Sequence, residues 1–182
     1  MDALLLDFNG VVVDDEPLHL ESFRRVLFEV GISISDADYQ ELYLGLDDRG
    51  AFREAYSRAS RTLATELERA LIQRKAEHYA ELAARRLPVV PGVAEFVRGA
   101  ADAARIAIVS GALRREIEAG LDVAGIAAHV DVVVSSEATR SGKPDPECFR
   151  LALRELAERH GSGRWRACVV EDSLPGLAAA RA

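Results

Sequence analysis

Four short stretches of the sequence carry side chains that could do chemistry, and each follows a run of apolar residues. The candidates are Asp7, Asn9 and Gly10 after residues 4–6, Ser110 and Gly111 after residues 106–109, Lys143 in the polar loop 135–144 that follows residues 130–134, and Glu171 and Asp172 after residues 167–170. An apolar run that ends at a carboxylate and a glycine is typical of a buried strand that delivers an acid to a loop. The alternative for residues 7–10 is a surface turn, in which Asp7 and Asn9 serve turn formation alone.

If these candidates lie together, their charges indicate one kind of chemistry. Three carboxylates, those of Asp7, Glu171 and Asp172, cannot stay ionised side by side without a cation. No histidine or cysteine accompanies them in these loops, and hard oxygen ligands favour magnesium over zinc. Such an ion, together with Lys143 and the hydroxyl and amide donors of residues 110–111, would form a positive pocket for a phosphoryl group. Asp7 would then attack phosphorus, as carboxylates do when aspartyl-phosphates form.

A lysine in a polar loop is usually only solvated, but the rarity of lysine in this chain distinguishes Lys143. Only two of the 23 lysine and arginine residues are lysines, Lys75 and Lys143. Because arginine takes nearly every other cationic position, Lys143 favours a site that needs a compact ammonium rather than a planar guanidinium. Taken alone, Ser110 would more often be a helix cap, and residues 171–172 would be an ordinary acidic turn.

Helical patterns between the apolar runs would position these candidates. From residue 88 onward, β runs alternate with helical stretches at residues 93–103, 112–121 and 146–160, and Pro175 opens a last helix. Strand–helix–strand order predicts parallel pairing with right-handed crossovers. The predicted fold class is therefore α/β with a parallel sheet, whose strands would bring the candidates to one edge.

An all-helical insert interrupts this pattern after the first strand. Amphipathic spacing predicts four helices, over residues 18–30, from Ser35 or Asp36 to Tyr43, over residues 51–60 and over residues 65–85. The chain thus divides into a sheet half, residues 1–14 and 88–182, and a helical half, residues 15–87. We also expect a C-terminal segment to be missing, because the sequence stops inside an apolar helix.

Composition narrows the classes of partner. The 182 residues are 49% hydrophobic and 29% charged, with a net charge of −7, so the chain can fill a core but offers no basic stripe for nucleic acid. Cys148 and Cys168 lack the spacing of a zinc site or a disulfide framework. Neither a signal-peptide pattern nor a membrane-length apolar run is present in the sequence, which favours the cytoplasm.

Taken together, the motifs resemble those of the haloacid dehalogenase superfamily. The resemblance rests on Asp7-Phe8-Asn9-Gly10-Val11 with Asp14 to Pro17, on Val109-Ser110-Gly111, on Gly142-Lys143-Pro144-Asp145-Pro146, and on Glu171-Asp172-Ser173 with Gly176. The helical insert after the first motif and the position of His19 are most similar to the β-phosphoglucomutase-like phosphatase branch. The resemblance covers nearly the whole chain and implies a Rossmann-like core with an inserted α-helical cap domain. It also implies a further strand after the fourth motif, so we expect a C-terminal strand to be missing.

The resemblance implies catalytic and metal-binding roles for four residues. Asp7 would be the nucleophile. The carboxylate of Asp7, the backbone carbonyl of Asn9 and the carboxylate of Asp172 would hold magnesium, with Glu171 in or beside that shell.

The same resemblance implies how a substrate would be held. Ser110 and Lys143 would bind the phosphoryl oxygens, beside the amide of Gly111. His19 would lie at the hinge of the cap, near the active-site entrance. The loop from Gly45 to Arg49 would set substrate specificity.

Two positions depart from the family pattern. Asn9 stands where the phosphatases and mutases of the family have an aspartate that acts as general acid and base. An amide keeps the hydrogen bond and the backbone metal ligand but transfers no proton, a loss that typically costs about 10²–10⁴-fold in rate. We therefore expect slow turnover, and a strong increase on Asn9→Asp. Leu44 stands where the mutase has a lysine, which argues against a sugar-phosphate mutase.

The sequence therefore predicts a magnesium-dependent phosphatase that acts on a small phosphorylated metabolite. The alternative is a non-catalytic protein of the same fold that binds a phosphorylated metabolite. The acidic residues 171–172 suggest a metal, whereas the dehalogenases of the family need none, so dehalogenase chemistry is disfavoured. The phosphonatases use a cap lysine as a Schiff base, and the place of Lys75 inside a long helix gives no support to that role. Neither nucleic acid nor a membrane is an expected partner.

Overall fold

The computed structural model describes residues 2–43, 46, 48–161 and 165–182. The chain forms two compact units, one made of Met1–Asp15 with Leu87–Ala182 and the other of Glu16–Arg86. We call them the α/β unit and the helical unit.

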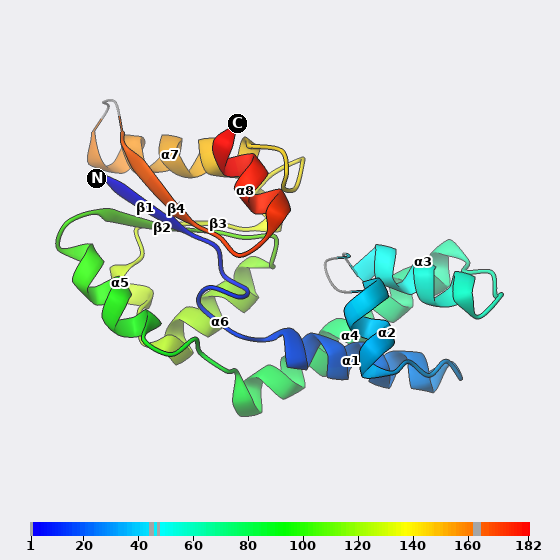
Figure 1. The fold of residues 1–182 in the computed structure, drawn as a ribbon. Coiled ribbons are helices and arrows are strands. Elements are labelled where there is room, and N and C mark those ends of the chain that lie inside the picture. Colours follow the sequence, from blue (N-terminus) through cyan, green and yellow to red (C-terminus); the bar gives the residue numbers. More distant parts are fainter. Residues whose placement is uncertain (1, 44–45, 47, 162–164) are drawn as a thin grey trace. The chain divides into compact units, whose positions relative to one another are not determined.

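The α/β unit is built on a parallel sheet in the order β3-β2-β1-β4. Its strands are β1 (Ala3–Leu6), β2 (Arg105–Val109), β3 (Val132–Val134) and β4 (Ala167–Val170). Its helices are α5 (Val93–Ala101), α6 (Arg114–Ala124), α7 (Glu147–His160) and α8 (Leu174–Arg181), with 3₁₀ turns at Ala127–His129 and Ser136–Ala138. The prediction of an α/β fold with a parallel sheet is confirmed (Figure 1).

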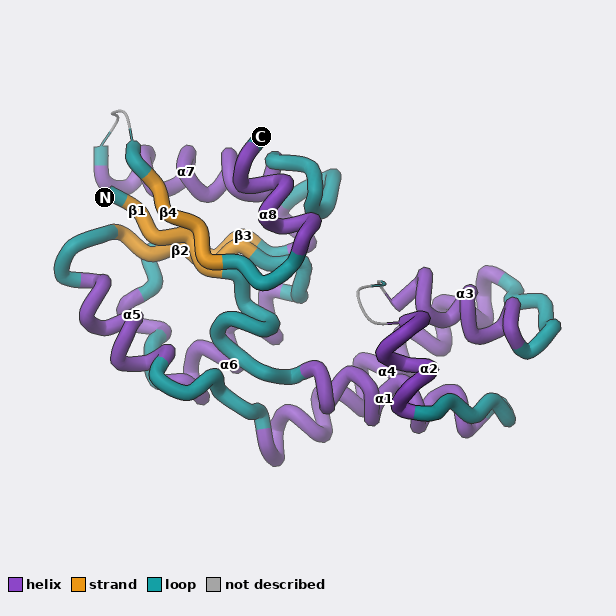
Figure 2. Tube along the Cα trace, viewed as in Figure 1, coloured by secondary structure: helices purple, strands orange, loops and turns teal. Residues whose placement is uncertain are grey.

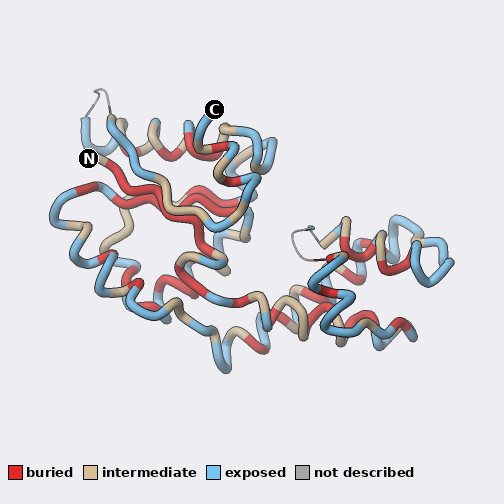
Figure 3. The backbone as a smooth tube through the Cα atoms, viewed as in Figure 1, coloured by how far each residue is buried: buried red, intermediate tan, exposed pale blue. Residues whose placement is uncertain are grey.

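Each face of the sheet carries its own apolar layer, because side chains alternate along a strand. Leu4, Leu6 and Ile106 belong to the cluster that includes residues of α5 and α6, whereas Leu5 and Ala107 belong to the cluster that includes residues of α7. Strand β1 and most of β2 and β3 are buried, as expected for a parallel sheet covered on both faces, whereas β4 is partly exposed (Figure 3).

Strand register brings the candidate loops level with one another. Leu6 pairs with Ile108 on β2 and with Val170 on β4. Residue 7 therefore leaves the sheet between the ends of these two neighbours, directly beside residue 171. The loops that follow the strands are drawn in teal in Figure 2. The outgoing chain at residues 12–14 hydrogen-bonds to the returning chain at residues 88–90, which fixes the base of the insert.

The helical unit packs α1 against α4 around an aromatic cluster. Its elements are α1 (Glu16–Glu29), α2 (Asp36–Asp38), a π-helix at Tyr39–Tyr43, α3 (Asp48–Arg58) and α4 (Thr65–Arg86). The ring of Phe23 lies 4.9 Å from that of Phe52 and 5.4 Å from that of Tyr43. Burial of such side chains, at about 1.5–3 kcal/mol each, holds helices together that are only marginal alone.

The structure corrects some predicted bounds. The third helix begins at Asp48 rather than at residue 51, and the second is a short α-helix capped by Ser35 that continues as a π-helix. Strand β3 begins at Val132, two residues later than predicted. No helix in the described part of the chain is long and apolar enough to cross a membrane.

Candidate active site

Lys143 bridges two carboxylates that follow neighbouring strands. Its Nζ atom lies 3.1 Å from Oδ1 of Asp7 and 2.5 Å from Oε2 of Glu171. All three side chains are largely withdrawn from solvent, with exposures of 14%, 12% and 0% for Lys143, Asp7 and Glu171. Charges buried this far are stable only when they are paired and hydrogen-bonded. The sheet therefore places the residues that the sequence predicted to converge within one contact shell.

Asp172 completes an acidic group next to this ion pair. One carboxylate oxygen from each of Asp7, Glu171 and Asp172 lies within 4.8 Å of the other two. The single ammonium of Lys143 balances only one of these carboxylates. An all-oxygen donor set with excess negative charge fits a hard divalent cation such as magnesium.

Two glycines make room for the acidic group. A Cβ atom at Gly10 would lie 2.0 Å from Oδ2 of Asp172, and one at Gly176 would lie 2.0 Å from the carboxyl carbon of Glu171. Gly10 also adopts a φ of 74°, a left-handed conformation that favours glycine. The two carboxylates thus lie directly against glycine backbone, and a larger residue at either position would displace them.

Burial and charge act differently on the two carboxylates that contact Lys143. Burial raises the pKa of Asp7 to about 6, the charge of Lys143 opposes this, and the Glu171 carboxylate adds to it. Burial also tends to raise the pKa of Glu171. Hydrogen bonds from Lys143 and Ser173 outweigh this effect and hold the pKa of Glu171 below its ordinary value. The two neighbouring acids therefore differ in proton affinity, which is common where carboxylates take separate roles.

Loop hydrogen bonds hold Lys143 in place. The backbone amides of Arg140 and Ser141 donate to Oε2 of Glu147, in the first turn of α7. The Lys143 ammonium also lies 5.4 Å from the centre of the Phe149 ring. The lysine is thus presented by a loop that is tied to the start of a helix.

Asn9 and Ser110 form a second polar group at this edge. The Ser110 hydroxyl donates to Oδ1 of Asn9 at 3.3 Å, and the amide of Asn9 donates to both carboxylate oxygens of Asp15, at 3.0 and 2.8 Å. Residues 9 and 110 were predicted to gather at the strand ends, and the structure places their side chains in contact. Gly111 follows as an exposed residue. The contact with Asp15 was not predicted from the sequence.

His19 and Arg49 belong to the helical unit. His19 lies on α1, where its ring stacks on Tyr79 with centroids 4.5 Å apart. Arg49 is exposed in the first turn of α3, so the predicted loop ends in a helix. Within that loop Gly45 and Asp47, like Leu44 before it, lie outside the described residues.

The sequence reading also passed over a buried cluster around Lys75. Its Nζ atom lies 2.5 Å from Oδ1 of Asp48 and 2.9 Å from Nδ1 of His19. Because an ammonium only donates, Nδ1 of His19 is the acceptor in this pair. The available signal was the rarity of lysine, which applied to Lys75 as much as to Lys143.

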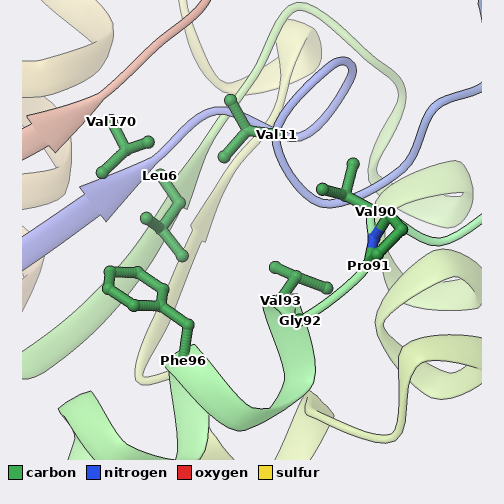
Figure 4. Close-up of a pocket in the computed structure, with 8 residues that line it drawn as sticks. All are labelled: Leu6, Val11, Val90, Pro91, Gly92, Val93, Phe96 and Val170. Carbon is green, nitrogen blue, oxygen red and sulfur yellow. The ribbon is translucent and has the colours of Figure 1, made fainter.

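An apolar pocket of about 250 Å³ lies within the α/β unit, next to the strand ends (Figure 4). It is lined by Leu6, Val11, Val90, Pro91, Gly92, Val93, Phe96 and Val170. Its lining side chains are all apolar, so it offers nothing to orient a phosphoryl group. The candidate chemistry is therefore assigned to the strand ends and not to this pocket.

Comparison with known proteins places the whole chain in one family. The family model for haloacid dehalogenase-like hydrolases matches residues 1–182. A phosphorylated carbohydrates phosphatase of Thermotoga maritima is 28% identical over 182 residues, a match covering all of this chain and 81% of the relative. The fructose-1-phosphate phosphatase YqaB of Escherichia coli is 27% identical, with coverage of 99% and 91%.

Solved structures share the fold along the full chain. CbbY from Rhodobacter sphaeroides in complex with phosphate is 26% identical, with a TM-score of 0.82 over 100% of this chain and 82% of that one. A mutant of the same protein, in complex with xylulose-(1,5)bisphosphate, is 27% identical with a TM-score of 0.81 and the same coverage.

Proposed function

The chain belongs to the haloacid dehalogenase-like hydrolases, and on that basis we propose that it is a magnesium-dependent phosphatase of phosphorylated sugars or similar small metabolites. The observation that carries the proposal is the geometry at the strand ends. Lys143 contacts Asp7 at 3.1 Å, and oxygens of Asp7, Glu171 and Asp172 lie within 4.8 Å of one another. Relatives named as phosphatases of phosphorylated carbohydrates and of fructose 1-phosphate support the substrate class.

In the proposed reaction a carboxylate oxygen of Asp7 attacks phosphorus, and the bond from phosphorus to the sugar oxygen breaks. Water then hydrolyses the aspartyl-phosphate, which releases inorganic phosphate and restores Asp7. Lys143 and the Ser110 hydroxyl would hold the phosphoryl oxygens. The Asp7, Glu171 and Asp172 carboxylates and the Asn9 carbonyl would hold magnesium, which offsets the negative charge of the phosphoryl group.

Asn9 makes the proposed reaction slow, because its amide supplies no proton to the leaving oxygen. In the proposed reaction water supplies that proton, and the expected cost is about 10²–10⁴-fold in rate. This same observation favours a second candidate function, a protein that binds a phosphorylated metabolite without turning it over.

Phosphate release separates the two functions. Purified protein with magnesium is assayed on a panel of sugar phosphates, beside Asp7→Asn, which keeps the shape of the side chain but removes the nucleophile. Asp14→Asn is the matched control, since Asp14 is exposed nearby in the sequence. We expect release by the wild type and the control but not by Asp7→Asn. Ligand binding without release above the Asp7→Asn background would instead establish the binding protein.

A further inference from the structure

The side chain of Asn9 is held at both ends. Its Nδ2 atom donates to both oxygens of Asp15, at 2.8 and 3.0 Å, and its Oδ1 atom accepts from Ser110 at 3.3 Å. Asp15 is only 1% exposed. A carboxylate this deeply buried needs hydrogen-bond donors, and Asn9 supplies two contacts.

The polarity of these contacts admits one orientation of the amide. The backbone N–H of Ala112 donates to Oγ of Ser110 at 3.1 Å, so the hydroxyl hydrogen is free to point at Oδ1 of Asn9. At the other end a carboxylate offers acceptors only, so it must meet the NH₂ group of Asn9. Donor direction therefore runs unbroken from Ala112 through Ser110 and Asn9 to Asp15.

A tight loop returns residue 15 to residue 9. The amides of Val12 and Val13 both donate to the carbonyl of Phe8, and the amide of Gly10 donates to the carbonyl of Val13. The positive φ of Gly10 permits this reversal. The loop thus builds the contact between residues 9 and 15 from backbone that belongs to the α/β unit.

We propose that Asp15 is a positioning residue for Asn9, and that residues 9 and 15 act as one donor–acceptor pair. For its effect on turnover the inference rests on the proposed phosphatase function. A carboxylate at residue 9 alone would face Asp15 with no N–H between them, at the present separation of about 3 Å. The expectation that Asn9→Asp alone raises turnover is thereby revised. Exchange of both residues, Asn9→Asp with Asp15→Asn, restores one donor and one acceptor and places the carboxylate at residue 9.

Thermal unfolding of four proteins tests the pair directly: the wild type, Asn9→Asp, Asp15→Asn and the exchanged double variant. Each single change should lower the unfolding temperature by about 4 °C or more, and the double variant should recover at least half of the summed loss. Asn9→Asp with Asp14→Asn is the matched control, because it has the same composition but leaves Asp15 in place. It should show no recovery. Additive losses in the exchanged variant would overturn the pairing.

Phosphate release with magnesium gives the second readout. We expect Asn9→Asp not to exceed the wild type, and the exchanged variant to exceed Asn9→Asp about tenfold or more in kcat with KM changed less than threefold. A merely structural role for Asp15 would not produce this rise. If Asn9→Asp alone matches the exchanged variant, Asp15 does not govern residue 9. Thermal recovery without phosphate release in any variant would uphold the pair while rejecting the phosphatase.

Discussion

Both lysines of this arginine-rich chain lie in polar clusters, one in each unit, and the two clusters differ in their balance of charge. Lys143 meets Asp7 and Glu171, whose side chains are only 12% and 0% exposed, and Asp172 adds a third carboxylate. Lys75 meets one carboxylate, that of Asp48, which is 38% exposed, together with Nδ1 of His19.

The Lys75 cluster is therefore balanced in charge, whereas the Lys143 cluster carries an excess of negative charge that a cation could neutralise. In the helical unit one ammonium faces one carboxylate, which can also draw on solvent. In the α/β unit one ammonium faces three acids. Asp7 and Glu171 are largely withdrawn from solvent and Asp172 is exposed, and uncompensated charge is costly where water is excluded. A lysine in a polar cluster is therefore weak support for a candidate site, and the excess of acid around Lys143 is the stronger support for the proposed one.

Replacement of each lysine by methionine is the strongest way to break this contrast. Lys143→Met should lower kcat for phosphate release by about 10²–10³-fold, because a charged donor to the phosphoryl group is lost. Lys75→Met should change kcat little, because one ammonium and one carboxylate already balance in that cluster. Steady-state kinetics on the best sugar phosphate of the panel measures both. Equal losses of kcat would mean that both lysines serve the chemical step.

Magnesium should distinguish the clusters through stability as well as activity. Ion at about 100 times its Kd should stabilise the wild type by about 2.7 kcal/mol, seen as a rise in unfolding temperature, and a chelator should abolish phosphate release. Asp172→Asn should lose most of that stabilisation. Asp48→Asn, in the helical cluster, is the matched control and should keep it. An unchanged response in Asp172→Asn would remove Asp172 from the ion site.

Two glycines with similar φ values, one in each unit, should differ in the cost of substitution by alanine. Gly10 and Gly31 have φ values of 74° and 72°, but only at Gly10 would a Cβ meet Asp172, whereas nothing lies within 4 Å at Gly31. Gly31→Ala should cost about 1–2 kcal/mol of unfolding free energy, the left-handed strain alone. Gly10→Ala should cost more and should also weaken the magnesium response. Equal costs in chemical denaturation would show that Asp172 moves aside freely.

Residue patterns were sufficient for the parallel sheet and for the gathering of residues at its edge. Apolar runs of strand length separated by helical periods admit few arrangements, and parallel pairing brings the carboxyl ends of the strands to one edge of the sheet. The sequence therefore predicted that four residues which follow strands lie together, namely Asp7, Lys143, Glu171 and Asp172. The bounds of short elements were less secure, as the early start of α3 at Asp48 shows, because local preference competes there with packing.

Side-chain partners were decided only by the folded structure. Asn9 contacts Asp15, six positions along the chain, because the loop between them reverses at Gly10. Lys75 contacts His19, 56 positions away, because α4 packs on α1. Neither contact leaves a periodic trace in the sequence. Periodicity reports which face of an element is buried, whereas the pairing of two polar groups depends on backbone paths and helix packing that arise only once the chain has folded.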